Sequence, residues 1–345
     1  MATESLHLSA LTAKWLQGGG EMGELIRAKD WSRTSLGPVG DWSPSLRTAA
    51  SICLGSKFPI LIWWGPDFTM LYNDGYRPML GTKHPRSLGQ SGRECWSEIW
   101  HIIGPMLEGV RSRGEATWSD DQMLPLHRLG FTEECYFTFT YSPIRNDAGG
   151  VEGVFCAVME TTERVLAARR LATLRALAAN APEGHNATIA CCDAVTTLAA
   201  TPEDTPFAAM YLVETDGTTL TRVSVAGLPG DEATLPALVR LDAPAGELER
   251  VLASACTVES AKSCRTLDVE ATPLPPLPAR PWPELVRTVA CLGVTQPGQS
   301  RPYGVLLVGI SPRRPLDPAY RSFLELAAGH VATSIANSRS HEEER

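Results

Sequence analysis

The segment at residues 134–144 constrains the fold more than any other part of the sequence. Its side chains alternate between two sets, with Phe137, Phe139 and Tyr141 at one parity and Tyr136, Thr138 and Thr140 at the other. Because successive side chains of a β-strand point to opposite faces, this alternation predicts a strand with one face in an apolar core. Burial of one face only is typical of an antiparallel sheet.

Four further strands are predicted around this one. Each is a short run rich in apolar residues and bounded by turn-forming residues. The runs span residues 58–64, 68–72, 116–124 and 151–159. The first two are separated by Gly65-Pro66-Asp67 and are therefore expected to form a hairpin.

One long helix is predicted between the second and third strands. Across residues 94–110, apolar side chains recur at steps of three and four, which is the spacing of one helix face. Pro105 lies inside this segment and lacks a backbone N–H, so a kink is expected there. Two strands, helices and then three strands predict an antiparallel sheet with helices on one face.

The tryptophans divide the chain into two parts. Eight of the nine lie in the first 118 residues, and after about residue 161 the sequence becomes rich in Ala, Leu and Thr. The change coincides with an amphipathic helical pattern at residues 163–177. A chain of 345 residues is expected to hold about two domains. We expect an N-terminal extension or cap at 1–44, a first domain at 45–160, a connecting helix at 161–180 and a second domain at 181–340, with a closing helix at 317–345.

The second part has its own α+β pattern. Two helices, at 187–200 and 246–253, precede the closing helix. Apolar runs predict strands at 207–214, 220–225, 288–292 and 303–310. The fold class expected for the whole chain is thus α+β, with two domains that each contain an antiparallel sheet flanked by helices.

Three motifs of the first part resemble those of PAS domains and occur in the same order. Tyr72-Asn73-Asp74 resembles the element that ends a PAS strand, and Tyr141-Ser142-Pro143-Ile144, followed by Asp147 and Gly149, resembles a PAS hairpin. Glu160-Thr161-Thr162-Glu163-Arg164 resembles the element that closes many PAS domains before a signalling helix, with Glu in place of the usual Asp.

The second part resembles a GAF domain. The similarity is carried by residues 304–310, by Arg313-Arg314-Pro315-Leu316-Asp317 and by the closing helix, whereas residues 226–285 match weakly. A PAS-like domain followed by a GAF-like domain is similar to the N-terminal sensory region of bacterial sensor histidine kinases, including hybrid ones. The resemblance implies a regulatory chain that perceives a small-molecule, redox or protein cue and transmits it to a C-terminal output domain of a two-component system.

Charge and hydropathy exclude several other functions. The net charge is −8, with a pI near 5.5, which argues against nucleic acid as a main partner. No apolar run approaches the roughly 18 residues of a membrane span, and the N-terminus lacks a secretory pattern. We therefore expect a cytoplasmic protein whose nine cysteines are thiols.

The PAS resemblance singles out Glu160 and Thr162 as signal-relay residues. A carboxylate and a hydroxyl where a strand turns into a helix can accept backbone N–H groups and cap the helix. The pair is expected either to serve only as this cap or also to transmit strain into the following helix.

A ligand pocket is expected between the first sheet and its helices. The expected lining residues are Tyr72, Trp96, Trp100, Tyr136 and Phe139. The same aromatic set is also what a filled core would contain. The sequence requires no cofactor and no metal site.

Flavin and haem remain alternatives for a sensor of this kind. Gly92-Arg93-Glu94-Cys95-Trp96 resembles the cysteine-bearing helix of flavin-binding PAS domains, but the flavin-holding Gln and Asn residues are missing, so Cys95 is expected to be a small buried residue. PAS and GAF domains can bind haem through one His. The candidate ligands are His84, His101, His127, His185 and His330.

Catalysis by this chain is not expected. His341 is followed by Glu342-Glu343-Glu344-Arg345 rather than by the phosphoacceptor sequence of a kinase, and no P-loop motif is present. The alternative from another class is a GAF-like thiol enzyme that uses Cys191, Cys192, Cys256, Cys264 or Cys291, although packing explains the first two as well.

The helices at 161–180 and 317–345 are expected to pair with their twins in a homodimer. The closing helix carries an apolar stripe, Phe323, Leu324, Ala327, Ala328, Val331, Ile335 and Ala336, which is explained either by core packing or by dimerisation. The charged, helix-favouring run at its end suggests that a longer protein continues into an output domain.

Overall fold

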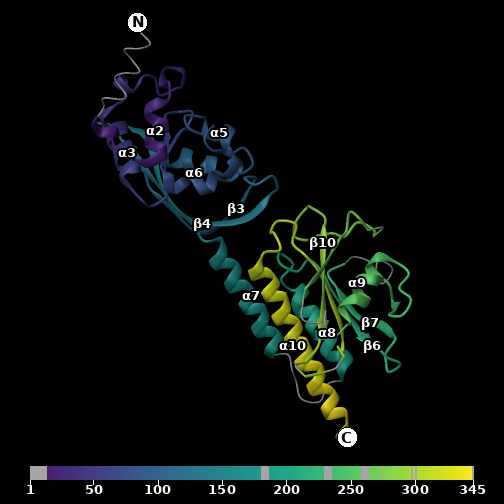
Figure 1. Ribbon diagram of the computed structural model, residues 1–345. Coiled ribbons are helices and arrows are strands. Elements are labelled where there is room, and N and C mark those ends of the chain that lie inside the picture. The colour runs from purple at the N-terminus through teal and green to yellow at the C-terminus, as the bar shows by residue number, and fades with distance from the viewer. Residues whose placement is uncertain are drawn as a thin grey trace. The chain divides into compact units, whose positions relative to one another are not determined.

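The computed structural model describes residues 14–179, 186–228, 235–257, 264–272, 274–296, 298–299 and 301–343. The chain divides into two compact units, Met1–Val165 (unit 1) and Leu166–Arg345 (unit 2), each containing one antiparallel sheet (Figure 1). The predicted α+β class is therefore confirmed. The ends of three predicted segments, at 1–13, 180 and 344–345, lie outside the described residues. Within those residues, no helix has the length and apolar character needed to cross a membrane.

The sheet of unit 1 has the strand order β2-β1-β5-β4-β3, so its first and last strands are neighbours. Its strands are β1 (Ile60–Trp64), β2 (Thr69–Tyr72), β3 (Thr117–Leu126), β4 (Glu133–Arg145) and β5 (Val151–Glu160). Each predicted strand occurs within a few residues of its expected place, and the predicted hairpin of β1 and β2 is confirmed.

The predicted alternation of β4 is also confirmed. Phe137, Phe139 and Tyr141 are buried, whereas the intervening residues are only half-buried. The opposite strand, β3, has an irregular register between Ser119 and Gln122, where Asp121 takes a positive φ of 46°. This bulge increases the local twist at the edge of the sheet.

The helices of unit 1 lie before β1 and between β2 and β3. They are α2 (Gly20–Ala28), α3 (Pro44–Gly55), α4 (Arg77–Leu80), α5 (Gly92–Cys95) and α6 (Trp100–Arg113), with short 3-10 turns at Lys14–Leu16, Trp31–Arg33, Val39–Asp41, Asp74–Tyr76 and Gly81–Lys83. Residues before α3 share the core of the sheet through Leu16, Met22, Trp31 and Trp42. Asp74 attaches α2 to this core, since its Oδ1 accepts a 2.8 Å hydrogen bond from the Met22 N–H.

The prediction of one helix over 94–110 is wrong, because the segment forms α5 and α6 with a break at residues 96–99. Tertiary contacts explain the break. The Gly92 N–H at the start of α5 donates to the Phe68 carbonyl beside β2 (3.0 Å), whereas α6 packs against β4 and β5. The backbone of Trp96 leaves the helical region (ψ 36°), which lets the two helices take separate directions. Pro105 lies within α6, which continues through it.

Helix α7 (Thr162–Ala179) begins in unit 1 directly after β5 and continues into unit 2. The sheet of unit 2 has the order β8-β7-β6-β11-β10-β9, again with first and last long strands adjacent at its centre. Its strands are β6 (Ala208–Val213), β7 (Thr219–Ala226), β8 (Leu238–Arg240), β9 (Arg265–Asp268), β10 (Thr288–Val294) and β11 (Gly304–Gly309). The helices are α8 (Ala187–Ala199), α9 (Glu247–Ala255) and α10 (Pro318–Glu343).

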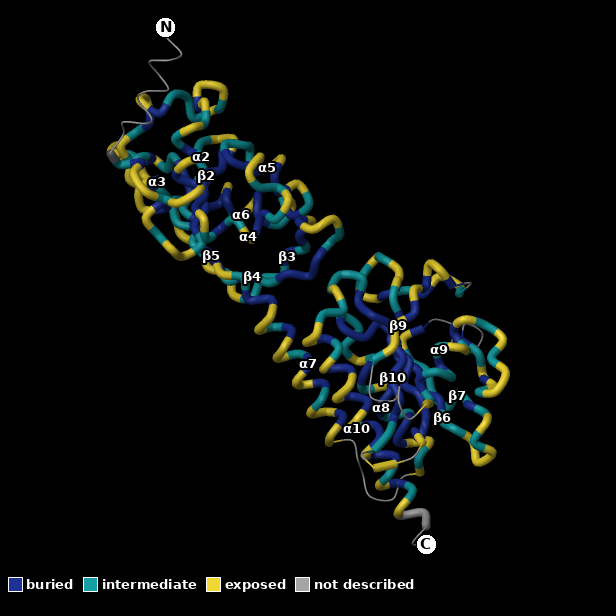
Figure 2. Tube along the Cα trace, viewed as in Figure 1, coloured by how far each residue is buried: buried dark blue, intermediate teal, exposed yellow. Residues whose placement is uncertain are grey.

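Both faces of this second sheet are covered, and its central strand β11 is buried throughout (Figure 2). The apolar stripe of α10 packs into the core beneath the sheet: Phe323, Leu324, Ala327, Ala328, Val331 and Ile335 are all buried there. Of the two explanations for this stripe, core packing within unit 2 is therefore confirmed.

Candidate functional site

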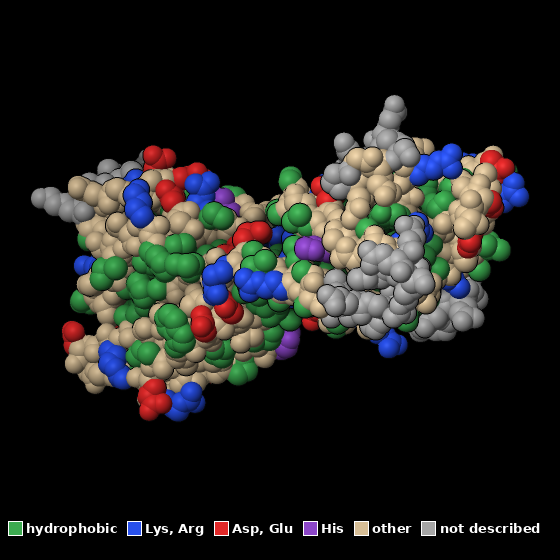
Figure 3. All heavy atoms as spheres, turned by 90° about the horizontal axis from the view of Figure 1, so that it is seen from below, with side chains coloured by type: hydrophobic (Ala, Val, Ile, Leu, Met, Phe, Trp, Pro, Cys, Tyr) green, Lys and Arg blue, Asp and Glu red, His purple; other side chains and the backbone are tan. Residues whose placement is uncertain are grey.

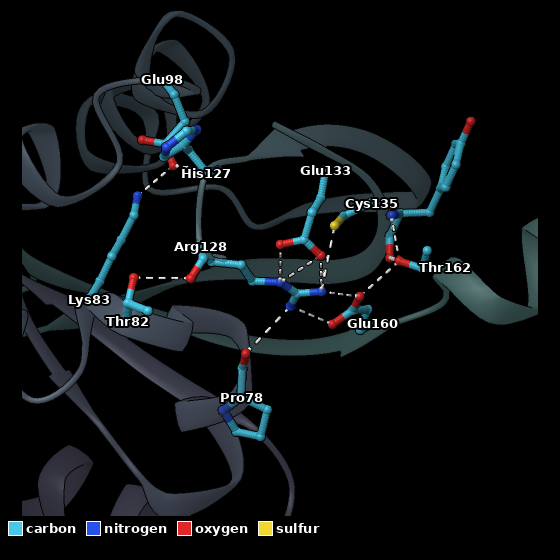
Figure 4. A network of polar contacts seen from close by, with 11 residues as sticks. Pro78, Thr82, Lys83, Glu98, His127, Arg128, Glu133, Cys135, Glu160 and Thr162 are labelled. Carbon is cyan, nitrogen blue, oxygen red and sulfur yellow. Dashed lines mark hydrogen bonds and ion pairs between the residues drawn. The ribbon is translucent and has the colours of Figure 1, made fainter. Parts of the chain in front are cut away.

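The point at which β5 turns into α7 is built around Arg128, which lies in the connection between β3 and β4. Its guanidinium donates two hydrogen bonds of 2.8 Å to the two carboxylate oxygens of Glu160, the last residue of β5 (Figure 4). Its Nε also donates to Glu133 Oε1 at 3.2 Å. The side chains of Arg128 and Glu133 are only 10% and 5% exposed, so their ion pair is buried, whereas the side chain of Glu160 is 27% exposed.

Thr162, the first residue of α7, joins this group. Its hydroxyl donates to Glu160 Oε1 (2.9 Å) and accepts from the backbone N–H of Tyr136 on β4 (2.9 Å). The N–H of Thr161 donates to the Tyr136 carbonyl (2.8 Å). The two predicted relay residues therefore meet, and these contacts bind them to Arg128 and to β4.

We call Arg128, Glu133, Glu160 and Thr162 the junction cluster. Burial disfavours the charge of Arg128, but its hydrogen bonds with Glu160 and Glu133 hold the pKa of the guanidinium above its usual range. A pair of carboxylates thus shares one buried cation. Removal of one member of a buried ion pair typically costs about 3–5 kcal/mol, because the remaining charge is left without compensation.

The connection that carries Arg128 is also bonded to the helical side of unit 1. The carbonyl of Arg128 accepts from the N–H and the hydroxyl of Thr82, both at 3.1 Å. The N–H of His127 donates to Glu98 Oε1 (3.2 Å), and the same oxygen pairs with Lys83. The cluster at the start of α7 is therefore linked through one connection to the helices that face the sheet.

A small apolar cavity of about 40 Å³ lies between the sheet and these helices. Its thirteen lining residues are Trp63, Tyr76, Met79, Trp96, Ile99, Ile103, Leu124, Leu126, Phe137, Phe139, Tyr141, Cys156 and Val158. Such a volume holds roughly three water molecules and is far below the several hundred Å³ of drug-sized pockets.

Of the five residues expected to form one pocket, only Trp96 and Phe139 line this cavity. The other three do not line this cavity. The hydroxyl of Tyr72 is hydrogen-bonded to His84 Nδ1 (3.0 Å), and Trp100 packs edge-on against Trp63.

Tyr136 is the third, and it lies on the opposite face of β4, where its hydroxyl donates to Glu134 Oε1 (2.8 Å). Because adjacent residues of a strand point to opposite faces, Tyr136 and Phe139 cannot face the same cavity.

Two of the cofactor candidates, Cys95 and His127, line the same hollow next to α5. Cys95 is buried, as expected, and its thiol donates to Ser87 Oγ at 3.2 Å. Of the five candidate histidines, His185 lies outside the described residues. Within the described parts, no group of three or more His, Cys, Asp or Glu side chains is arranged to hold a metal ion.

Four of the five cysteines of unit 2 lack the environment of reactive thiols. Burial raises the pKa of Cys191 and of Cys256 to about 12. Burial also raises the pKa of Cys264 and Cys291 above the ordinary value. Since thiol chemistry needs the thiolate, these four residues are poorly suited to nucleophilic attack at neutral pH.

A second hollow, of about 340 Å³, is polar and lies next to α5. It is lined by Lys83, Arg86, Gln90, Glu94, Cys95, Ser97, Glu98 and His127. Lys83 already pairs with Glu98, donates to the carbonyl of Cys95 (2.6 Å) and lies 4.3 Å from the ring centroid of Trp96. Lys83, which lines the polar hollow, thus contacts Trp96, which lines the apolar cavity.

Arg128 and Glu133 were not singled out by the sequence. One signal was present: Glu133-Glu134 opens a strand that is otherwise apolar on one face, and both residues are almost fully buried. Buried carboxylates require a cation or several hydrogen-bond donors. The sequence does not say which of the 31 Lys and Arg residues supplies it.

Comparisons with known proteins address the fold. Residues 56–166 match the family model described as the PAS fold. No curated protein matches this sequence. A GAF domain from an Acinetobacter phosphoenolpyruvate-protein phosphotransferase is 14% identical, with a TM-score of 0.36, and the match covers 50% of this chain and 95% of that one.

Two further solved structures come from signalling proteins. A sensory box sensor histidine kinase from Vibrio cholerae is 17% identical, with a TM-score of 0.24, and the match covers 30% of this chain and 77% of that one. Residues 122 to 287 of a methyl-accepting chemotaxis protein are 16% identical, with a TM-score of 0.36, and the match covers 48% of this chain and 97% of that one. The family match and the five-stranded sheet with its facing helices lead to one conclusion: residues 56–166 of this chain have the PAS fold.

Proposed function

We propose that this chain is the cytoplasmic sensory region of a bacterial signalling protein, in which unit 1 perceives a cue and α7 carries the change to unit 2 and to an output domain. A GAF-like role for unit 2 and a histidine kinase as the output are parts of the proposal. The observation that supports it most is the junction cluster, which ties the first residue of α7 to three parts of unit 1.

The cavity and the junction cluster share the same strands. Leu126 at the end of β3 lines the cavity, and Arg128 follows two residues later. Val158 on β5 lines it as well, two residues before Glu160. A molecule that enters or leaves the cavity would thus move the residues next to both partners of the ion pair. Packed elements of this kind tend to switch between discrete arrangements, so a small shift can be transmitted.

Further along, α7 is anchored within unit 2. The Nε atoms of Arg169 and Arg170 donate to the two carboxylate oxygens of Asp204, at 2.6 and 3.0 Å. Asp204 has a side chain that is 1% exposed, and the guanidinium of Arg170 lies 4.1 Å from the ring centroid of Tyr320 on α10. Helix α7 is therefore attached rigidly to unit 2 about two turns after its first residue, and a displacement of its start would act on this attachment.

Homodimerisation through α7 and α10 completes the proposed mechanism. The main apolar stripe of α10 is used inside unit 2, so the dimer would use the outer faces of these helices. Each outer face retains an exposed leucine, Leu171 (47% exposed) on α7 and Leu326 (56%) on α10.

The outer face of the first sheet is a second surface to which a partner could bind. Trp118 is 70% exposed and Met159 50% exposed. In Figure 3, hydrophobic side chains gather on the visible face of the left-hand unit, which is unit 1.

The small volume of the cavity argues against the two cofactor alternatives, flavin and haem. About 40 Å³ suits a guest of a few atoms better than a flavin or a haem, so we propose a colourless cue for unit 1. An absorption spectrum of the purified protein tests this part. A Soret band, or a structured band near 450 nm, would overturn it.

Fusion of the chain, in helical register, to the catalytic core of a dimeric histidine kinase tests the proposed function. The combined change of Glu160→Ala and Thr162→Ala should alter autophosphorylation severalfold while unit 1 stays folded. Arg113→Gln, at an exposed arginine 3.9 Å from Glu115, is the matched control and should leave the rate unchanged. Equal rates for the wild type and the double variant would contradict the proposal.

A further inference from the structure

An irregular stretch of β3 is one residue longer than the part of β4 that it faces. Three steps along β3, from Ser119 to Gln122, match two steps along β4, from Phe139 to Phe137. The extra residue of this bulge lies opposite Thr138. Bulges are common at sheet edges, where they re-aim the side chains around them. The side chains that follow the bulge in β3 therefore change face.

The core of unit 1 depends on this change of face. Trp118 precedes the bulge and is 70% exposed, whereas Leu124 and Leu126 follow it and are buried. In a regular strand these three residues would share one face, because they are separated by even numbers of positions. The bulge is thus a fixed part of the sheet, and the residues inside it keep a defined place.

The bulge holds Asp121 in an uncommon backbone conformation. Its φ of 46° lies in the left-handed region, which few residues other than glycine adopt and which aspartate tolerates better than most. The Asp121 N–H donates to Thr138 Oγ1 (3.1 Å), and the Thr138 hydroxyl in turn donates to Asp120 Oδ1 (2.8 Å). One threonine therefore fixes the backbone from which the Asp121 side chain extends.

The Asp121 side chain reaches the first turn of α7. Its Oδ1 accepts a hydrogen bond from Nη2 of Arg164, the third residue of this helix. The neighbouring Thr161 hydroxyl and the Arg164 guanidinium lower the pKa of Asp121 below its ordinary value, so the carboxylate is charged at neutral pH. The helix dipole disfavours a cation in the first turn. Asp121 supplies the anion that compensates Arg164 there.

The first turn of α7 thus has two attachments that differ in their exposure to solvent. In the junction cluster, the side chains of Arg128 and Glu133 are 10% and 5% exposed. In the second attachment, the side chain of Arg164 is 64% exposed and that of Asp121 31%. Dissolved ions screen exposed charges much more than buried ones. Salt should therefore weaken the second attachment and leave the first nearly intact.

We propose that Asp121 is a second positioning residue for α7, and that its pairing with Arg164 makes the start of this helix respond to ionic strength. The signalling consequence rests on the proposed function, in which α7 carries a change from unit 1 to unit 2. The attachment itself does not, because it can be measured in this chain without an output domain. Ionic strength would then act on α7 in addition to any cue that unit 1 perceives.

Hydrogen exchange of the full chain at 20 mM and 500 mM NaCl, at one pH, tests the inference. The Debye length falls from about 20 Å to about 4 Å over this range. The amides of residues 165–168 should exchange about two- to threefold faster at the higher salt, a modest change because isolated exposed ion pairs are weak. The amides of α8 serve as the internal reference, since no residue of either attachment belongs to this helix.

Asp121→Asn removes the charge and keeps a residue type that tolerates a positive φ. It should raise exchange at residues 165–168 about two- to threefold in 20 mM NaCl and abolish the dependence on salt. Asp242→Asn is the matched control, since it breaks another exposed arginine pair, in unit 2, and should change neither value. A salt dependence of the wild-type size in Asp121→Asn would overturn the inference.

Arg164→Gln tests the same contact from α7 and leaves the bulge untouched. If the pair positions the helix, the loss of Arg164 should speed exchange at residues 165–168 in 20 mM NaCl. Without a pair, relief of the unfavourable helix dipole should slow it. The double variant with Asp121→Asn should exchange no faster than either single variant, because both changes remove one contact. Slower exchange in Arg164→Gln, or additive effects in the double variant, would contradict the proposed attachment.

The outcomes separate this inference from the proposed function. Salt-dependent exchange that disappears in Asp121→Asn, together with a kinase fusion that does not respond to the junction variants, would retain the second attachment and contradict the sensory role. A fusion that responds to the junction variants, with exchange at residues 165–168 that is independent of salt, would retain the sensory role and contradict the second attachment.

Discussion

Arg128 and Glu160 meet through two parallel hydrogen bonds of 2.8 Å at the residue where the last strand of unit 1 gives way to α7. Two-point contact between a guanidinium and a carboxylate fixes orientation as well as distance. The two residues are 32 positions apart, so the contact reports on the relation between the β3–β4 connection and the end of β5. We expect a cue to change the position of this connection relative to the end of β5.

Arg128→Gln should destabilise unit 1 by about 3 kcal/mol, because it leaves the carboxylate of Glu133 buried without its cation and removes the partner of the half-buried Glu160. Urea unfolding followed by tryptophan fluorescence measures the loss, since eight of the nine tryptophans belong to this unit. Arg113→Gln removes an arginine whose side chain is 62% exposed and should change stability by less than about 0.5 kcal/mol. Equal effects of the two variants would show that the buried pairs contribute nothing.

Thr162→Val should cost about 1–2 kcal/mol, since the change removes the hydroxyl that bridges Glu160 and the Tyr136 N–H while it preserves the shape of the side chain. Thr162→Ser keeps the hydroxyl and is the matched control. Thermal unfolding of both variants measures the difference. A valine variant as stable as the wild type, with a loss in the serine variant alone, would show that the methyl group and not the hydrogen bonds is responsible.

Asp204→Asn should destabilise unit 2 by about 3 kcal/mol, because two arginines of α7 lose a carboxylate whose side chain is 1% exposed. Asp242→Asn is the control, since Asp242 pairs with Arg240 at a similar distance, 2.8 Å, but both side chains are more than half exposed. Circular dichroism of the second unfolding transition gives the comparison. A loss at Asp242 as large as that at Asp204 would argue against a specific anchor for α7.

The Cys256 thiol should react with iodoacetamide at pH 8 roughly 10³-fold more slowly than free cysteine. Its pKa is raised to about 12 by burial, so the thiolate that reacts is scarce until the pH approaches that value. Mass spectrometry of native and urea-unfolded protein measures the ratio. Rapid labelling of the native protein would reopen the thiol-enzyme alternative.

Much of the fold could be predicted because local signals agreed with the tertiary structure. The alternation in β4 and the turn between β1 and β2 both mark elements that the structure contains. Strands β8 and β9 were missed because they are short and expose most of their residues, so they carry no apolar run. The single helix expected over 94–110 failed because α5 is bonded to Phe68, beside β2, whereas α6 packs against β4 and β5, and these contacts overrode the periodicity.

The candidate site was less predictable, for a reason visible in β4. The alternation that predicted this strand also places Tyr136 on the face opposite Phe139, so both could not line one cavity. The sequence contains no signal for Arg128. A buried arginine cannot be distinguished from an exposed one in the sequence, because its partners Glu133 and Glu160 come close only in the folded chain. Long-range ion pairs of this kind depend on strand order, which local patterns do not contain.

Hydrogen exchange of the amides at the start of α7 tests the central claim most directly. In Glu160→Gln, which keeps the size of the side chain and removes its charge, the amides of residues 163–168 should exchange at least tenfold faster than in the wild type. The amides of β4 at its centre and of α8 should exchange at the same rate in both proteins. Unchanged exchange at 163–168 in this variant would contradict the claim that the junction cluster controls the start of α7.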